Sequence, residues 1–161
     1  MSNGTWRWVS TQALILLHDE SLAEHGGSTG IRDAGLLDSA MARPLNLAAY
    51  AEPDVAELAA CYGFGIAQNH PFVDGNKRVA LLAVGLFLGL NGKRLVTTQL
   101  DATETILRLA AGDIDETLLA EWIRRHLEDP LTATTGSGAR HTSAHRKATS
   151  TSPRPPPVHG L

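Results

Sequence analysis

The chain of 161 residues has a single cysteine, Cys61, and few aromatic side chains, which make up 5% of its residues. One cysteine excludes any disulfide within the chain and is typical of proteins from a reducing compartment. Because aromatic residues are scarce, the core must be filled mainly by aliphatic side chains, and the abundance of leucine and alanine favours helices. The composition therefore predicts a helical protein without internal cross-links.

Long apolar segments are also missing. Residues 79–90 form a stretch of twelve apolar or glycine residues, whereas a membrane-spanning helix needs about 20. The N-terminal sequence MSNGTWRWVS has no apolar run of the kind found in secretory signals. From these two absences we expect a soluble cytoplasmic protein.

Acidic residues are absent from the C-terminal part of the chain. Residues 1–129 hold all 17 acidic residues and ten basic ones, whereas residues 130–161 hold four basic residues and no acid. The acidic body argues against direct binding of nucleic acid through a broad basic face. The tail is rich in Ser, Thr, Pro and Gly, which predicts disorder, although a basic arm that contacts a partner is an alternative. We therefore expect one helical domain at 1–129 and a disordered tail at 130–161.

Apolar periodicity and capping residues predict five or six helices packed around a buried central helix. The segment that follows residue 75 is apolar nearly all round, so we expect it at the centre. Gly63 and Gly65 cost about 1 kcal/mol each inside a helix and therefore suggest close packing against a neighbour. The expected N-caps are Asp33, Asp54, Asp101 and Asp115, and the expected helix ends are Gly26-Gly27, Pro44, Pro71, Asn91-Gly92 and the residues around Glu128.

The most polar stretch of the chain, NHPFVDGNKR at 69–78, lies directly before this apolar helix. Turn and capping chemistry alone could account for it, since Gly75-Asn76 suits a positive φ. However, a helix N-terminus presents unpaired N–H groups that favour an anion, and Gly75 permits close backbone approach. Lys77 and Arg78 add two positive charges at the helix end where cations are unfavourable. These features favour a bound phosphate chain.

Two side chains of the loop suggest chemistry beyond binding. Asp74 could hold Mg²⁺ beside a nucleotide, because this ion prefers oxygen ligands; capping the helix or pairing with Arg78 are the alternatives. His70 has an imidazole suited to accept a hydroxyl proton near neutral pH. A zinc site is disfavoured, because Pro71 breaks the helical spacing between His70 and Asp74. Phe72 has no chemistry of its own and is expected to support the loop from the core.

These residues resemble the signature of the Fic/Doc family, H-x-F-x-(D/E)-G-N. Lys77 stands where Fic AMP-transferases usually carry glycine, and Leu81 replaces the second arginine of the Fic pattern; both departures favour the Doc (death on curing) branch. The resemblance spans roughly residues 8–128. Its other parts are ALILLHDESLAEHGGSTGIRDAGLLDSAMARP, similar to the Doc N-terminal segment, and AAGDIDETLLAEWIRRHL, similar to the closing helices.

The resemblance implies a small all-α bundle and a toxin of a toxin–antitoxin system. Doc toxins are kinases that bind ATP reversed relative to Fic enzymes and transfer its γ-phosphoryl group to a threonine of elongation factor Tu, which inhibits translation. A Phd-type antitoxin silences them. By the same resemblance His70 would be the base, Asp74 would hold Mg²⁺, and Arg78 would join them as a catalytic residue. The residues expected to bind the phosphates are Gly75, Asn76, Lys77 and Arg78.

Two other functions remain open at this point. One is adenylyl transfer, in which AMP and not the γ-phosphoryl group is passed to a protein hydroxyl. The other is a catalytically inactive module that only captures an antitoxin, although the intact set of motif residues argues against it. For Arg32 and Asp33, upstream of the loop, we expect a helix-capping role, and contact with a nucleotide or target is the alternative.

Overall fold

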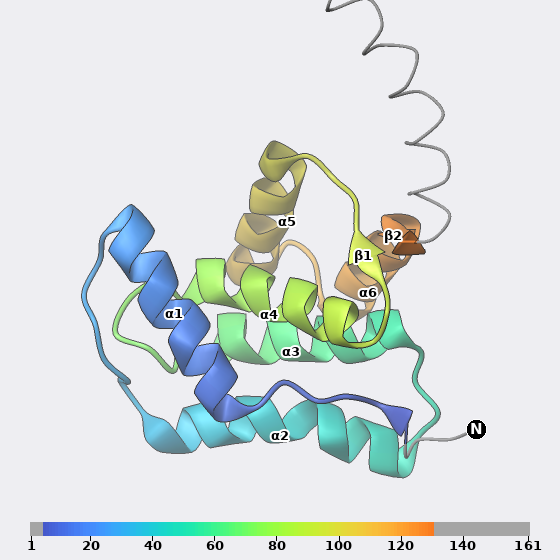
Figure 1. The fold of residues 1–161 in the computed structure, drawn as a ribbon, viewed down its shortest axis with the longest axis horizontal. Coiled ribbons are helices and arrows are strands. Elements are labelled where there is room, and N and C mark those ends of the chain that lie inside the picture. The colour runs from blue at the N-terminus through green and yellow to red at the C-terminus, as the bar shows by residue number, and fades with distance from the viewer. Residues whose placement is uncertain (1–4, 131–161) are drawn as a thin grey trace, which may run out of the picture. The chain divides into compact units, whose positions relative to one another are not determined.

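The computed structural model describes residues 5–130 and within them contains six helices and one two-stranded sheet (Figure 1). This confirms the predicted all-α class; the predicted disordered tail lies outside the described residues. Within the described part no helix has both the length and the hydrophobicity needed to cross a bilayer. The elements are α1 (Thr11–His25), α2 (Ala34–Tyr50), α3 (Val55–Asn69), α4 (Asn76–Leu90), β1 (Arg94–Leu95), α5 (Gln99–Ala111), α6 (Glu116–Arg125) and β2 (Leu127–Glu128).

The central helix is α3, which packs against α2, α4, α5 and α6. Ten of its 15 residues are buried. α4 packs on α3 and α1 but leaves Leu82 and Leu90 exposed on its outer face. The expectation that the apolar segment after residue 75 would be the central one is therefore wrong: α3 is surrounded by α2, α4, α5 and α6, whereas α4 keeps an outer face exposed to solvent.

Glycine on α3 allows this close packing, as the sequence suggests. A β-carbon on Gly63 would lie 2.8 Å from Cγ2 of Val84 on α4. One on Gly65 would lie 3.4 Å from Cα of Ala40 on α2. Gly63 therefore lets α4 approach α3 more closely than a larger residue would permit, whereas at Gly65 the approach of α2 is close to ordinary van der Waals contact.

Three predicted helix boundaries are wrong, and the first is Pro44. Pro44 does not end α2, which continues to Tyr50 with Pro44 buried inside it. An internal proline removes one helical hydrogen bond and costs about 3 kcal/mol, but Leu47 and Ala48 beyond it pack on the core and offset that cost.

The N-cap of α5 is Thr98 and not Asp101, because the Thr98 hydroxyl accepts from the Asp101 N–H. At the other end of the bundle, α6 stops at Arg125 rather than near Glu128. The residues after it form β2, which pairs antiparallel with β1 through Leu95 opposite Leu127. Residues 127–128, which helical periodicity assigns to α6, instead pair with the strand that follows α4.

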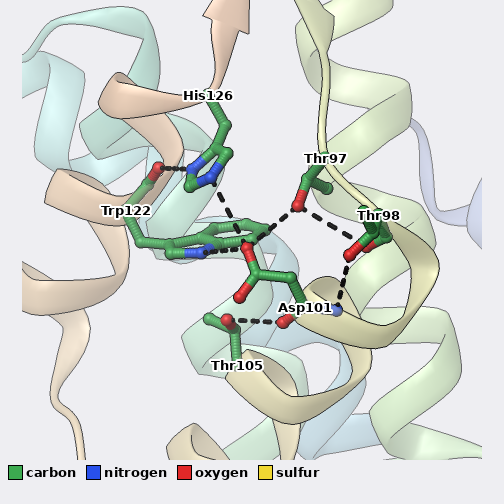
Figure 2. A network of polar contacts seen from close by, with 6 residues as sticks. All are labelled: Thr97, Thr98, Asp101, Thr105, Trp122 and His126. Carbon is green, nitrogen blue, oxygen red and sulfur yellow. Dashed lines mark hydrogen bonds and ion pairs between the residues drawn. The ribbon is translucent and has the colours of Figure 1, made fainter.

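Asp101 serves instead as the centre of a polar network between α5 and α6 (Figure 2). Its Oδ2 accepts from the Thr97 hydroxyl at 3.0 Å and from the Trp122 indole N–H at 3.1 Å. His126 Nε2 lies 3.5 Å from the same oxygen. This network ties the start of α5 to the end of α6.

Asp54 joins α3 to α6 at the surface. Its Oδ1 accepts from the Glu57 N–H as part of a capping box, its Oδ2 accepts from Nε of Arg124 at 2.9 Å, and Nη2 of Arg124 lies 2.8 Å from the same oxygen as an ion pair. Burial alone raises the pKa of the Asp54 carboxyl, but the hydrogen bonds from Arg124 and from backbone N–H groups outweigh it and hold the pKa below its usual value.

This lowered pKa makes stability depend on pH at the acid end. Because the folded state favours the carboxylate, the stabilisation is present above the unfolded pKa of about 3.9 and is lost as the pH falls through the lower folded value. Asp54→Asn should therefore show a shallower fall of melting temperature below about pH 4 than the wild type. Asp38→Asn, which changes an exposed carboxylate of α2, should keep the wild-type slope. An unchanged slope in Asp54→Asn would contradict this assignment.

Candidate active site

The polar loop 70–75 connects α3 to α4 and lies against the loop between α1 and α2, on the same side of the bundle in Figure 1. The Val73 N–H donates to the Gly30 carbonyl at 3.0 Å. Ile31 forms an isolated antiparallel bridge with Phe72. Two loops that are 40 residues apart in sequence thus hold each other as short extended segments.

Phe72 and Asn76 fix the shape of the loop from within. Phe72 is 1% exposed and belongs to the hydrophobic core. The Asn76 amide bonds both backbone groups of Phe72: its Oδ1 accepts from the Phe72 N–H at 2.9 Å, and its Nδ2 donates to the carbonyl at 3.0 Å. Because this amide is occupied by the loop, what Asn76 can offer an anion is its backbone N–H.

A buried histidine that the sequence argument does not place supports the loop from α1. His18 is 1% exposed, and its ring stacks on Phe72 with 3.9 Å between the ring centroids. Its Nε2 lies 2.7 Å from the Asp74 carbonyl oxygen, which can only accept, so Nε2 carries the hydrogen in this bond. The sequence does indicate that His18 is buried, because Leu14, His18 and Leu22 follow one another at helical spacing on the buried face of α1.

The Asp74 carboxylate is exposed and points back toward the α1–α2 loop. Its Oδ1 accepts from the Gly75 N–H at 2.8 Å and its Oδ2 from the Ser28 N–H at 3.2 Å. It neither caps α4 nor forms an ion pair with Arg78 among the described residues. The carboxylate therefore takes neither alternative role, helix cap or partner of Arg78. Each of its oxygens accepts one hydrogen bond and keeps a further lone pair.

α4 begins without a side-chain cap. Gly75 is the N-cap residue with φ 77°, and no side chain accepts from the first N–H groups of the helix. Lys77 and Arg78 lie exposed in the first turn, and neither forms an ion pair within residues 5–130. Free N–H groups, the positive end of the helix dipole and two unpaired cations together favour an anion.

Lys77 and Arg78 also line one part of a groove of about 510 Å³ between α1, α4 and α5. Four leucines and an isoleucine contribute to the rest of its lining, with two carboxylates on the α1 side. The remaining lining residues are Leu17, Glu20, Ser21, Glu24, His25, Leu81, Leu82, Gln99, Thr103, Ile106 and Leu107. Lys77 and Arg78 therefore lie between the polar loop and the leucine and isoleucine side chains of this groove.

His70 is exposed at the junction of α3 and the loop, as the C-cap of α3. Its backbone is left-handed, with φ 47° and ψ 56°, and within residues 5–130 it is the one non-glycine residue with positive φ. Pro71 explains why the helix stops, since the residue before proline is excluded from the α region. His70 is thereby exposed to solvent where α3 ends.

Cys61, in contrast, offers no chemistry. It is 2% exposed inside α3, and burial raises the pKa of its thiol to about 12, with the charge of Arg43 opposing and that of Glu116 adding to the shift. A thiol with such a pKa is almost wholly protonated at neutral pH, and only the thiolate is a nucleophile. Within the described residues no group of three or more His, Cys, Asp or Glu side chains could hold a metal by itself.

Gly27 sets the position of the Asp74 carboxylate. It has φ 126°, and a β-carbon there would lie 2.7 Å from Leu22 Cδ2 and 2.9 Å from Asp74 Oδ2. At Gly26, with φ 83°, a β-carbon would meet nothing within 4 Å. Gly27→Ala should therefore lower the free energy of unfolding by about 1–3 kcal/mol more than Gly26→Ala, because only the first adds crowding to backbone strain. Urea unfolding of the two variants measures this, and equal losses would contradict it.

Comparison with known proteins identifies the family to which the chain belongs. Residues 8–88, which run from before α1 almost to the end of α4, match the model of the Fic/DOC family. The chain belongs to the Fic/DOC family. It is 33% identical over 120 residues to Protein kinase doc of Escherichia phage P1, covering 74% of this chain and 94% of that protein. It is 40% identical over 96 residues to Toxin Doc of Mycolicibacterium smegmatis, covering 56% of this chain and 72% of that protein.

For this Fic/DOC protein, the structure gathers every predicted site residue at one loop and the first turn of α4. Their exposure differs: Phe72 is buried, Gly75 and Asn76 are half-buried, and the ionisable side chains are exposed. The contributions that sequence reasoning misses come from outside the motif, namely His18 on α1 and the backbone of Gly27 and Ser28. These residues act through hydrogen bonds that involve backbone groups, and a local sequence pattern does not reveal such bonds.

Proposed function

We propose that the protein is a Doc-type toxin that acts as an ATP-dependent protein kinase on a threonine hydroxyl. The observation that carries this proposal is the uncapped N-terminus of α4, flanked by exposed His70, Asp74, Lys77 and Arg78. The two relatives support it, since one bears the name protein kinase and the other the name toxin.

To catalyse phosphoryl transfer, a protein mainly has to position the reacting groups and neutralise charge on the phosphate oxygens. The N–H groups of Asn76, Lys77 and Arg78 would receive phosphate oxygens of the substrate ATP, and the two side-chain cations would balance their charge. His70 would accept the proton of the threonine hydroxyl as its oxygen forms a bond to the γ-phosphorus. The bond from that phosphorus to the β–γ bridging oxygen breaks, and ADP leaves.

Asp74 fits the requirement for a magnesium ligand. It is an exposed carboxylate beside the proposed phosphate cradle, and its own hydrogen bonds to backbone N–H groups fix its orientation. Mg²⁺ is commonly held by one or two carboxylates together with substrate phosphates and waters. When bound, the ion would supply charge neutralisation at the phosphates.

For the partners we propose elongation factor Tu as the acceptor, with inhibition of translation as the consequence, and a Phd-type antitoxin as the inhibitor. The support is family membership together with the apolar groove beside Lys77 and Arg78. A partner segment lying there would reach the cations and compete with nucleotide phosphates. The cytoplasm, where the translation factor is found, is the corresponding location.

The test is transfer of label from ATP in a bacterial extract to which the purified protein is added. We expect label from the γ position to enter one protein of the size of elongation factor Tu, and label from the α position to enter none. Transfer of the α label would instead identify an adenylyl transferase. Transfer of neither label would contradict enzyme function and leave a binding module.

A further inference from the structure

We propose that Arg32 is the positioning residue for His70: its guanidinium holds the backbone turn from which the imidazole projects. The inference rests on the function proposed above, because that function makes His70 the base. The observation that requires explanation is the left-handed backbone of His70, a conformation that non-glycine residues adopt uncommonly. Such a turn persists only when its surroundings hold it.

The guanidinium of Arg32 bonds the turn at two points. Its Nε donates to the His70 carbonyl at 2.7 Å, and its Nη2 donates to the Asn69 carbonyl at 2.8 Å. Carbonyl groups at the end of a helix have no partner within the helix, and the negative end of the dipole favours a cation there. The rigid fork of arginine can serve two neighbouring carbonyls at once, which the single ammonium of lysine does less well.

The backbone around Arg32 continues the same clamp. The N–H groups of Arg32 and Asp33 both donate to the Pro71 carbonyl, at 2.7 and 3.1 Å. In return, the Asn69 side chain donates to the Leu36 carbonyl on α2 at 2.9 Å. The carbonyls of three consecutive residues, 69 to 71, are thus all held by two consecutive residues at the start of α2.

The imidazole itself has no such support. It is exposed, and the structure gives its nitrogens no hydrogen bond to any residue in the described part of the chain. A catalytic base is usually oriented by a third side chain, but here only the backbone at His70 constrains the base, by setting the direction of its Cα–Cβ bond. Release of the clamp should therefore move the base, and a displacement of about 1 Å costs about a hundredfold in rate.

Arg124 provides a matched control at the opposite end of α3. It too bonds a helix terminus through two nitrogens, in this case to the Asp54 carboxylate at the N-cap. Arg32→Met and Arg124→Met each remove a two-point arginine contact from one end of the same helix. Both should lower stability, but only Arg32→Met changes the residue that carries the base.

The experiment compares steady-state γ-phosphoryl transfer and the crystal structures of both variants. We expect Arg32→Met to lower kcat by about a hundredfold with the KM for ATP changed less than about threefold, Arg32→Lys to recover part of the loss, and Arg124→Met to match the wild type. In the Arg32→Met crystal, His70 should leave the left-handed region. An unchanged His70 backbone with unchanged kcat, or an equal loss of kcat in Arg124→Met, would overturn the proposal.

The crystallographic measurement also separates this inference from the proposed function. If the wild type transfers no γ label, the kinase proposal fails. The φ of His70 in Arg32→Met then decides by itself whether Arg32 holds the turn.

Discussion

Replacing His70 by alanine should abolish γ-phosphoryl transfer, with a fall in kcat of about 10²- to 10⁴-fold, the usual contribution of a general base. The side chain is exposed, so the variant should fold, with a small loss of stability from alanine in a left-handed turn. The physical reason for the loss is that no other described imidazole lies in the loop to take the hydroxyl proton. Steady-state transfer with γ-labelled ATP measures the effect.

His70→Asn separates the role of the imidazole from that of the backbone. Asparagine tolerates the left-handed conformation well, so this variant should keep the turn and still lose transfer. Val73→Ala, which trims an exposed apolar side chain of the same loop, should retain activity. Full activity in His70→Asn would show that the base lies elsewhere.

Replacing Phe87 by alanine should lower the free energy of unfolding by about 3–5 kcal/mol, the usual cost of deleting a buried phenylalanine. Phe87 is fully buried on α4, and its ring lies 5.2 Å from that of Tyr62 on α3. Trp6 and Trp8, from the segment before α1, pack against it with tilted rings at 6.1 and 5.9 Å between centroids. The deletion thus removes one of the contacts that hold the N-terminal segment on the bundle.

Urea unfolding measures this loss, and Leu90→Ala is its control. Leu90 lies one turn further along α4 but is 38% exposed, so its truncation should cost well under half as much. Since a domain of this size has a total stability of about 5–15 kcal/mol, the Phe87 variant should lose about a fifth of its stability or more. A loss no larger than that of Leu90→Ala would contradict the position of Phe87 in the core.

Much of the fold could be predicted from the sequence, because most helix ends are encoded locally. Asp33, Asp54 and Asp115 cap their helices as expected, since a short acidic side chain next to an apolar periodic segment satisfies N–H groups wherever the helix later packs. The errors arise where tertiary contacts decide. Pro44 stays inside α2 because the residues after it are needed in the core.

The candidate site divides in the same way. The motif from His70 to Arg78 is contiguous, so its residue types and the helix that follows could be recognised directly. His18 and Arg32 could not, because they act through loop carbonyls that belong to residues about 40–60 positions away. Every residue has a backbone carbonyl, so the residue type of the acceptor does not indicate that such a hydrogen bond forms.

The most direct test of the account is a titration of the ¹⁵N-labelled protein with ATP and Mg²⁺, followed through its backbone amide resonances. We expect the amides of Asn76, Lys77 and Arg78 to shift most, because they would donate to phosphate oxygens at the uncapped start of α4. Largest shifts in another part of the bundle, with these three amides unchanged, would contradict this.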